Sequence, residues 1–217
     1  MKLRLSNKRT AALTRVEVLV IAVTLVVLAL VAWASLPWLR EAAKRQNCFS
    51  RLRAEGFAIW LWAGDHNDKF PMEISTNDGG AREWMSGGNA FRCFQVMSNE
   101  LNTPRILICP ADNRQAATNF QGDFNEQRLS YFVGLDAQRK TNTSMFLFGD
   151  RNLTNNLGTK DGVLELTAKQ STGWTREMHN NRGNICLVDG SVQKLDAAQL
   201  RPALQATGVA TNRLVMP

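Results

Sequence analysis

Residues 18–36 read VLVIAVTLVVLALVAWASL, a run of nineteen residues without a charged side chain. Twelve of the nineteen are Val, Leu or Ile. As an α-helix this run would be about 28 Å long, close to the ~30 Å hydrocarbon core of a bilayer. Those twelve side chains would favour insertion by roughly 4–7 kcal/mol. The run therefore predicts a helix that anchors the chain in a membrane.

Basic residues before the run predict its orientation. They are Lys2, Arg4, Lys8, Arg9 and Arg15. Because Lys and Arg stay on the cytoplasmic side, we expect a single-pass protein with a cytoplasmic N-terminus and the rest of the chain outside. The alternative is a cleaved secretory signal, whose apolar region is usually ~7–15 residues and ends in a small-x-small site. Ala32-Trp33-Ala34 fits that pattern but lies inside the longer run.

An acidic residue, Glu17, directly precedes the apolar run. A carboxylate at the edge of a membrane helix is costly unless it is paired or reaches the interface, so it is a functional candidate by default. In the simpler interpretation, Glu17 lies at headgroup depth and only helps to cap the helix.

The segment ALTRVEVLV, residues 12–20, resembles the N-terminal processing motif of type IV prepilins and type II secretion pseudopilins. The resemblance implies cleavage between Ala12 and Leu13 by a prepilin peptidase, N-methylation of Leu13 and an assembly role for Glu17. Since Leu13 and Glu17 are one helical turn apart, this carboxylate could neutralise the terminal amine of its own chain or of a neighbour. The segment departs from the family at Ala12, where Gly is usual, and at Arg15, where an apolar residue is usual.

The rest of the pattern predicts an α+β, pilin-like fold, in which a long N-terminal helix packs on a small antiparallel β-sheet head. Four segments are expected: a basic leader (1–12), the transmembrane half of the helix (13–37), its amphipathic half (38–62) and a globular head (63–217). In the amphipathic half, an apolar stripe is formed by Phe49, Leu52, Gly56 and Ile59. Pro37 is a candidate kink, and the polar stretch from Gly64 to Asp68 is expected to end the helix.

Within the head, alternating apolar residues predict strands, and longer periodic segments predict two short helices. The expected strands are 105–109, 129–135, 144–148, 163–166, 184–188 and 191–195, and the expected helices are 90–101 and 197–206. Asp189-Gly190 separates the last two strands. This dipeptide predicts a hairpin with a two-residue type I′ turn.

The net charge of +7 would be compatible with a nucleic-acid binder. Four of the basic residues lie in the leader, however, and its removal leaves 22 basic and 19 acidic residues, a net charge of +3. No later stretch interleaves basic and aromatic residues. We therefore expect no nucleic-acid partner.

Four cysteines, Cys48, Cys93, Cys109 and Cys186, would lie in an oxidising compartment if the head is outside the cytoplasm. Three pairings are possible, and spacing alone does not choose among them. Cys48–Cys109 with Cys93–Cys186 is the favoured pairing, and four free buried thiols are the alternative. The chain has no CxxC motif, so we expect neither structural zinc nor thioredoxin-like chemistry, and no metal or cofactor.

His179 precedes Asp189-Gly190 in an H-X9-DG pattern. Four shorter motifs accompany it: Asn47-Cys48, Asp65–Pro71, Cys109-Pro110-Ala111-Asp112 and Gly149-Asp150. Together they resemble a domain that accompanies prepilin-type N-termini in planctomycete and verrucomicrobial proteins. The Asp189 side chain has a sufficient role in the turn, and His179 is expected to bond backbone at the base of the hairpin.

Enzymatic and calcium-binding roles are weaker interpretations. No Ser lies in a GxSxG elbow, and Cys186 is expected in the middle of a strand, so we expect no enzyme. Asp65, Asn67 and Asp68 could supply oxygen ligands to calcium, but Lys69 stands where an EF-type loop would place its next ligand. A turn stabilised by Asx side chains is the expected role of this stretch.

These observations favour a structural subunit anchored in the inner membrane, with its head in the periplasm. The resemblance implies assembly into a type II secretion or type IV pilus-like filament. Its expected partners are the membrane, copies of itself or related pseudopilins, the prepilin peptidase and a secretion or pilus assembly platform. The alternative is a membrane-tethered module that binds a polysaccharide or protein.

Overall fold

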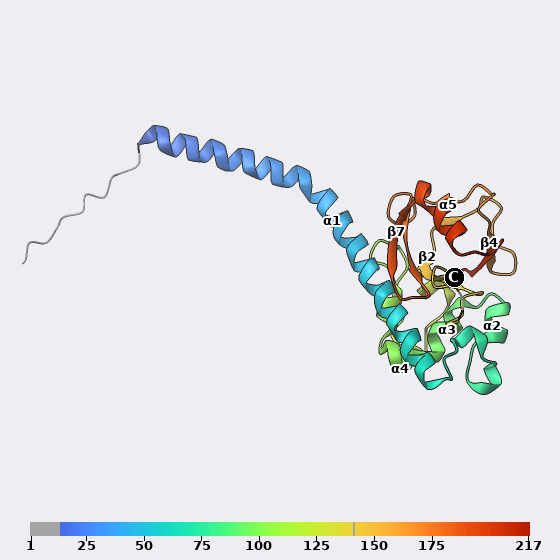
Figure 1. Ribbon diagram of the computed structural model, residues 1–217. Helices are drawn as coiled ribbons and strands as arrows, with labels where there is room; N and C mark the ends of the chain where they lie inside the picture. The colour runs from blue at the N-terminus through green and yellow to red at the C-terminus, as the bar shows by residue number, and fades with distance from the viewer. Residues whose placement is uncertain (1–13, 141) are drawn as a thin grey trace, which may run out of the picture. The chain divides into compact units, whose positions relative to one another are not determined.

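The computed structural model describes residues 14–140 and 142–217. A long helix, α1 (Arg15–Asp65), is followed by short helices and a six-stranded antiparallel sheet in this described part of the chain (Figure 1). The predicted α+β class, with a long N-terminal helix and a small antiparallel sheet, is confirmed. The chain divides after Arg40 into two compact units.

The first unit contains the N-terminal part of α1, and its apolar side chains are exposed. Leu30 is 66% and Trp33 78% exposed. The two hydroxyls within the apolar run bond back to carbonyls of the same helix: Thr24 Oγ1 lies 2.8 Å from the oxygens of Val20 and Ile21, and Ser35 Oγ donates to Ala32 at 2.9 Å. Polar groups satisfied within the helix suit an apolar environment. By length and composition, this helix could span a membrane.

In the second unit, α1 continues from Glu41 to Asp65 and buries one stripe of side chains. Leu52 and Ile59 are fully buried, as the predicted stripe requires. Gly56 belongs to the same stripe because a Cβ there would collide with Cys186 Sγ. The helix ends where Asn67 and Asp68 take left-handed φ values of 57° and 59°, three residues beyond the predicted end.

Six strands form the main sheet. They are β1 (Tyr131–Gly134), β2 (Phe146–Asp150), β4 (Val163–Leu166), β6 (Arg182–Leu187), β7 (Val192–Asp196) and β8 (Asn212–Val215). Their order is β4-β8-β1-β2-β6-β7, and every pair is antiparallel. The sequence pattern missed β8, which lies between β4 and β1. It also missed a separate two-stranded sheet of β3 (Leu153–Thr154) and β5 (Gly173–Trp174).

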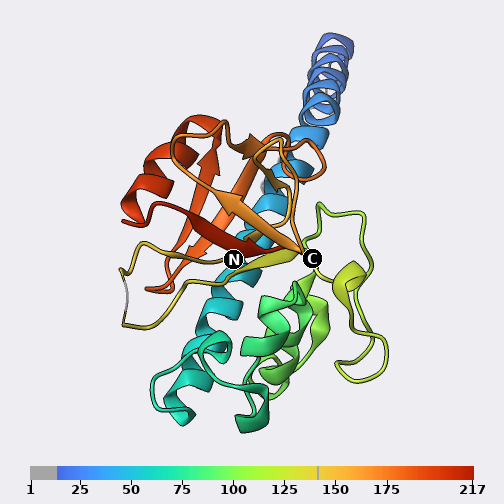
Figure 2. The same ribbon diagram turned by 90° about the vertical axis from the view of Figure 1, so that its right-hand side faces the viewer.

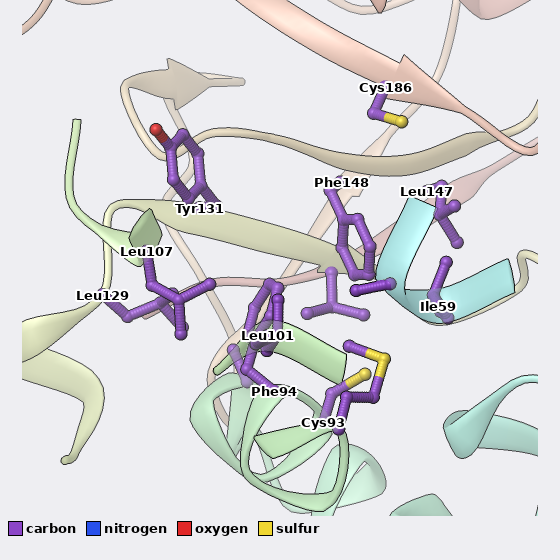
Figure 3. Close-up of a cluster of buried hydrophobic side chains, with 14 of the residues drawn as sticks. Ile59, Cys93, Phe94, Leu101, Leu107, Leu129, Tyr131, Leu147, Phe148 and Cys186 are labelled. Atoms are coloured by element: carbon purple, nitrogen blue, oxygen red, sulfur yellow. The ribbon is translucent and has the colours of Figure 1, made fainter. Parts of the chain in front are cut away.

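The main sheet separates two apolar clusters because alternate side chains point to opposite faces. Tyr131 and Val133 belong to the cluster that includes α1, part of which is drawn in Figure 3. Phe132 belongs to the other cluster, together with Leu200 and Leu204 of α5 (Ala197–Ala206). Helix α5 therefore packs on the face of the sheet opposite to α1, at the predicted position in the sequence.

Short helices connect α1 to the sheet. They are α2 (Arg82–Ser86), α3 (Ala90–Val96) and α4 (Ser98–Leu101), with 3-10 turns η1 (Pro71–Glu73), η2 (Thr76–Asp78), η3 (Pro104–Leu107) and η4 (Glu126–Arg128). In Figure 2 the green helices gather near the C-terminal end of α1. The predicted helix over 90–101 is two helices joined at Met97.

The predicted strand over 105–109 is wrong, because most of this segment is the 3-10 turn η3. Thr103 Oγ1 caps the turn by accepting from the Arg105 amide at 3.4 Å, and Pro104 supplies its first residue. The Arg51 guanidinium then occupies the carbonyls of Arg105 and Ile108. With those acceptors taken by a side chain, the segment does not pair as a strand.

The hairpin between β6 and β7 is confirmed, but its predicted two-residue turn is wrong. Gly190 has a φ of 80°, whereas Asp189 has no positive φ, which a type I′ turn requires. The Gly190 amide donates to Leu187 and the Leu187 amide to Ser191, both at 2.9 Å. These bonds close a three-residue loop in which Asp189 Oδ1 accepts from the Ser191 amide at 2.8 Å.

Candidate functional site

The first candidate site is the N-terminal turn of α1. The Thr14 amide donates to Glu17 Oε2 at 2.8 Å, and the Glu17 amide donates to Thr14 Oγ1 at 3.3 Å. This reciprocal pair is a capping box, in which each side chain satisfies an amide that the helix leaves unpaired. The Glu17 carboxylate therefore faces the N-terminal end of the helix. The predicted processing residues Ala12 and Leu13 lie outside the described residues.

The second candidate site is a buried cluster of Cys48, Cys109, Asp150 and His179. One donor atom from each of these side chains lies within 4.8 Å of all the others. The residues come from α1, from the segment after η3, from the end of β2 and from the loop before β6. Each belongs to a different motif of the sequence, so the fold brings four separate motifs to one place.

The donor atoms of this cluster face one another closely. Cys109 Sγ lies 3.2 Å from His179 Nε2, and Cys48 Sγ donates to Asp150 Oδ1 at 2.8 Å. Asp150 Oδ2 is 3.6 Å from the same His179 Nε2. Two sulfurs, a ring nitrogen and a carboxylate therefore converge on one small volume.

The loop that carries His179 has an unusual backbone. His179, Asn180 and Asn181 have φ values of 47°, 54° and 59°, three left-handed residues in succession. Such conformations cost about 1–3 kcal/mol each for non-glycine residues and persist only when the surroundings hold them. Here the Asn152 side-chain amide holds the loop, because its Nδ2, which carries two N–H donors, lies 3.0–3.1 Å from the carbonyl oxygens of Thr175, Met178 and Arg182.

Asp150 is held as firmly. Its Oδ2 accepts from the backbone amide of Asn184 at 2.7 Å and from the Asn184 side chain at 2.8 Å. Since both donors belong to β6, the carboxylate at the end of β2 is oriented across the pair of strands. Tyr131 adds its hydroxyl at 3.5 Å from Cys48 Sγ.

Burial and mutual contact shift the pKa values of this cluster. Burial raises the pKa of Asp150 to about 6. The hydrogen bond from Cys48, with a further one from His179, lowers the pKa of Cys109 to about 5. Burial raises the pKa of Cys48 well above its usual value. Cys109 is therefore the thiolate of the cluster at neutral pH, and Cys48 is its thiol.

A fifth ionisable group, Glu55, lies near the cluster on α1. It is fully buried, and neither carboxylate oxygen has a hydrogen-bond partner among the described residues. Burial and the nearby charge of Asp150 raise the pKa of Glu55 well above its usual value. This shift favours the neutral form of Glu55, which limits the negative charge beside Asp150 and Cys109.

The geometry of Cys109, His179 and Asp150 differs from that of a catalytic triad. In a triad the carboxylate holds the imidazole nitrogen opposite to the one that activates the nucleophile. Here Asp150 and Cys109 both face Nε2, whereas Nδ1 lies 3.9 Å from Glu41 Oε1. The His179 and Asp150 side chains are also fully inaccessible to solvent. The cluster is built as a convergent set of donors, not as a nucleophile relay.

The remaining predicted site residues lie elsewhere. All four cysteines are free thiols in the structure, so the favoured disulfides are absent and the free-thiol alternative is the one observed. Cys93 in α3 and Cys186 in β6 occupy different parts of the core in Figure 3, and burial raises the pKa of both thiols. Asp189 and Gly190 form the hairpin loop, where Asp189 Oδ1 accepts from the Ser191 amide and Gly190 has a positive φ.

The stretch from Asp65 to Asp68, whose side-chain oxygens could suit calcium, terminates α1. Asn67 and Asp68 adopt left-handed conformations, and the Asp68 amide donates to Ala63 at 2.9 Å. The Asp68 carboxylate pairs with Arg139. These residues therefore have roles in terminating α1 and in a surface ion pair.

Two features of the second site differ from what the sequence predicts. The sequence places His179 at the base of the hairpin, bonded to backbone, whereas its imidazole contacts Cys109 and Asp150. The sequence presents Asp150 only as part of a short Gly-Asp motif. The available signal was that four separate motifs each contain a residue type that ligates metals, which spacing rules for adjacent ligands do not detect.

Comparison of the chain with protein-family models, with curated proteins and with solved structures finds no match.

Proposed function

We propose that this chain is a pseudopilin-like structural subunit, held in the inner membrane by the N-terminal part of α1 with its head in the periplasm. After cleavage between Ala12 and Leu13 and N-methylation of Leu13, the subunit assembles into a type II secretion or type IV pilus-like filament. The observation that carries the proposal is an exposed apolar helix whose first turn presents the Glu17 carboxylate toward its N-terminal end.

An exposed apolar helix of this length must be buried against something other than water. A patch of that size on a soluble protein marks an interaction surface, and either lipid or neighbouring helices could bury it. In the membrane the helix is a monomeric anchor, and in a filament the same surface packs against other copies.

Glu17 would favour the change from the monomeric membrane anchor to the filament. Within one chain its carboxylate accepts from the Thr14 amide. In the processed chain the terminal amine would be at Leu13, next to that amide. A carboxylate in a low-dielectric bundle is stabilised by an opposite charge, so pairing with this amine, in its own or a neighbouring chain, would favour assembly.

The N-terminal mass of the mature protein tests the processing step. We expect a chain that begins at Leu13 with a mass increase of one methyl group. A mature chain that retains Met1 would contradict the processing part of the proposal.

A pair of substitutions at Glu17 tests the assembly step. Glu17→Gln keeps a capping side chain but removes the charge, and Glu17→Ala removes both. We expect both variants to reach the membrane fraction and neither to form filaments. Glu165→Gln, an exposed position on β4, is the matched control and should assemble normally. Filaments formed by Glu17→Gln would show that the charge is not needed.

A tethered binding module is the second candidate, because the head has a surface hollow beside the hairpin loop. It is lined by Arg53, Gly56, Phe57, Trp60, Asp189 and Gly190. Phe57 is 65% exposed there, and an aromatic face beside charged groups suits a sugar or peptide. If Phe57→Ala abolished binding of the intact protein to a polysaccharide while filaments were absent from the wild type, this second function would be favoured.

A further inference from the structure

We propose that Cys48, Cys109, Asp150 and His179 form a structural zinc site that fastens α1 to the sheet of the head. The proposal does not depend on the filament function, since all four residues belong to the unit that begins at Glu41. It also departs from the absence of a metal that the Cys spacing predicts.

The donor set suits zinc. Structural zinc sites use four protein ligands drawn from Cys, His and Asp in tetrahedral geometry. Two sulfurs and one imidazole nitrogen favour a borderline-soft ion over calcium or magnesium, which take oxygen ligands. All four residues are buried, as expected for a closed structural site without an open position for substrate.

The distances are also close to those of a tetrahedral site. With Zn–S bonds of about 2.3 Å and Zn–N or Zn–O bonds of about 2.0–2.2 Å, neighbouring donors lie about 3.3–3.8 Å apart. Cys109 Sγ lies 3.2 Å from His179 Nε2, and His179 Nε2 lies 3.6 Å from Asp150 Oδ2. The hydrogen bond between Cys48 and Asp150, at 2.8 Å, would lengthen by under ~1 Å when the metal replaces its proton.

The orientation of His179 distinguishes a metal site from other roles. Its Nε2 faces both Cys109 and Asp150, so a single ion could contact all three. Its Nδ1 is buried without a hydrogen-bond partner among the described residues, and the nearest carboxylate oxygen that pairs with it, Glu41 Oε1, lies 3.9 Å away. Zinc-bound histidines typically direct their second nitrogen at a carboxylate, which fixes the ring and raises its basicity.

The surrounding groups fit a bound ion as well. The backbone amide of Ala111 donates to Cys109 Sγ at 3.4 Å, and the Asn184 amides hold Asp150 Oδ2. Zn²⁺ with two thiolates, one carboxylate and a neutral imidazole carries a net charge of −1. The half-buried Arg45 is near enough to interact with the charges of Cys48 and Asp150 and would offset it.

Binding would couple four distant parts of the chain. Cys48 lies on α1, Cys109 after η3, Asp150 on β2 and His179 in the left-handed loop before β6. Zn²⁺ would displace the proton of the Cys48 thiol into solvent, and its binding energy would add to the folding free energy. The ion would thereby hold the strained loop and the helix to one edge of the sheet.

The zinc content of the full-length protein, purified in detergent and dialysed against metal-free buffer, tests the proposal. We expect about one zinc per chain by elemental analysis. Replacement by Co²⁺ should give the thiolate charge-transfer and ligand-field bands of a tetrahedral site, a readout that needs no mutation. A wild-type chain that binds neither ion, or that contains a Cys48–Cys109 disulfide by mass analysis, would overturn the proposal.

Variants then assign the ligands. Cys109→Ala and His179→Ala each remove one of the four ligands and should each lose most of the bound zinc on dialysis. Cys93→Ala removes a buried thiol that belongs to no donor cluster in the described part of the chain, and it should retain zinc at the wild-type level. Equal zinc content in the Cys109 and Cys93 variants would contradict the assignment. If a ligand variant fails to fold, the Co²⁺ spectrum of the wild type still decides.

Discussion

The two parts of α1 use similar apolar residues with opposite results. Before Arg40, Leu25, Leu28 and Leu30 are 61–66% exposed, whereas beyond it Leu52 and Ile59 are completely buried. The first part is apolar on every side, while the second has one apolar stripe with charged residues off it. A helix that is apolar all round suits lipid, and a striped helix suits the surface of a domain. One helix can therefore suit lipid in one part and pack on a domain in the other, when its pattern of apolar residues changes along its length.

The largest expected effect separates the two parts by stability. Leu52→Ala should lower the free energy of unfolding of the head by about 2–5 kcal/mol, because it leaves a cavity in a fully buried site. Leu28→Ala makes the same chemical change on the exposed part of α1 and should leave the free energy of unfolding of the head unchanged. Chemical denaturation followed by Trp fluorescence measures both. Equal effects would remove the distinction between the two parts.

A charged residue placed in the apolar part of α1 tests whether that part lies in a membrane. Leu28→Lys should weaken membrane insertion by about 3 kcal/mol, the cost of a Lys near the centre of a membrane helix. The fraction of the protein that sediments with membranes measures this. Leu157→Lys places the same charge at a 79% exposed position of the head and should have no effect. Because the apolar run favours insertion by roughly 4–7 kcal/mol, a second substitution, Leu25→Lys, is needed to abolish it, and unchanged sedimentation of the variant carrying both substitutions would contradict a transmembrane position.

Carboxylates offer a third contrast, because the head buries some of its acids. Burial raises the pKa of Glu126 from 4.5 to about 7. A raised pKa means that the folded state binds the proton more tightly, so this contribution to stability is complete below about pH 4.5 and is lost as the pH rises to about 7. Glu126→Gln should therefore gain about 1–2 kcal/mol over the wild type at pH 8, a figure reduced for partial solvent screening.

Denaturation at several pH values checks this prediction. The stability difference between Glu126→Gln and the wild type should shrink toward zero near pH 4.5. Glu165→Gln, on an exposed position of β4, is the control and should show no comparable trend. A difference that stays constant with pH would mean that Glu126 does not titrate in this range.

The smallest expected effect is at the first turn of α1. Thr14→Ala removes one half of the capping box and should destabilise that turn by about 1 kcal/mol. Amide hydrogen exchange of residues 15–18 should accelerate, while exchange in the head stays the same. Thr14→Ser retains a capping hydroxyl and should behave as the wild type.

Local patterns were sufficient to predict the features that depend on neighbouring residues. The apolar run, the amphipathic stripe and the polar stretch ending at Asp68 placed α1 to within a few residues. The Asp189-Gly190 signal located the hairpin, because the turn preference of that dipeptide is local. Its loop is one residue longer than predicted, since the Asp189 side chain bonds the Ser191 amide.

Features that depend on distant residues were not predictable in this way. The segment 105–109 has the composition of a strand, but Arg51 from α1 occupies two of its carbonyls. Strand β8 is inserted between β4 and β1, and neither partner is adjacent to it in the sequence. Such pairings reflect tertiary contacts that override local preference.

The amino-acid sequence by itself determined the long helix, the change of its pattern from all-round apolar to striped, and the position of the hairpin, because periodicity and turn preference act over a few residues. Only the tertiary structure decided that His179 contacts Cys109 and Asp150 instead of the hairpin, and that Cys48 joins them. Those four side chains are separated by up to 131 positions in the chain. Their approach depends on how α1, β2 and the left-handed loop pack together, which no local pattern contains.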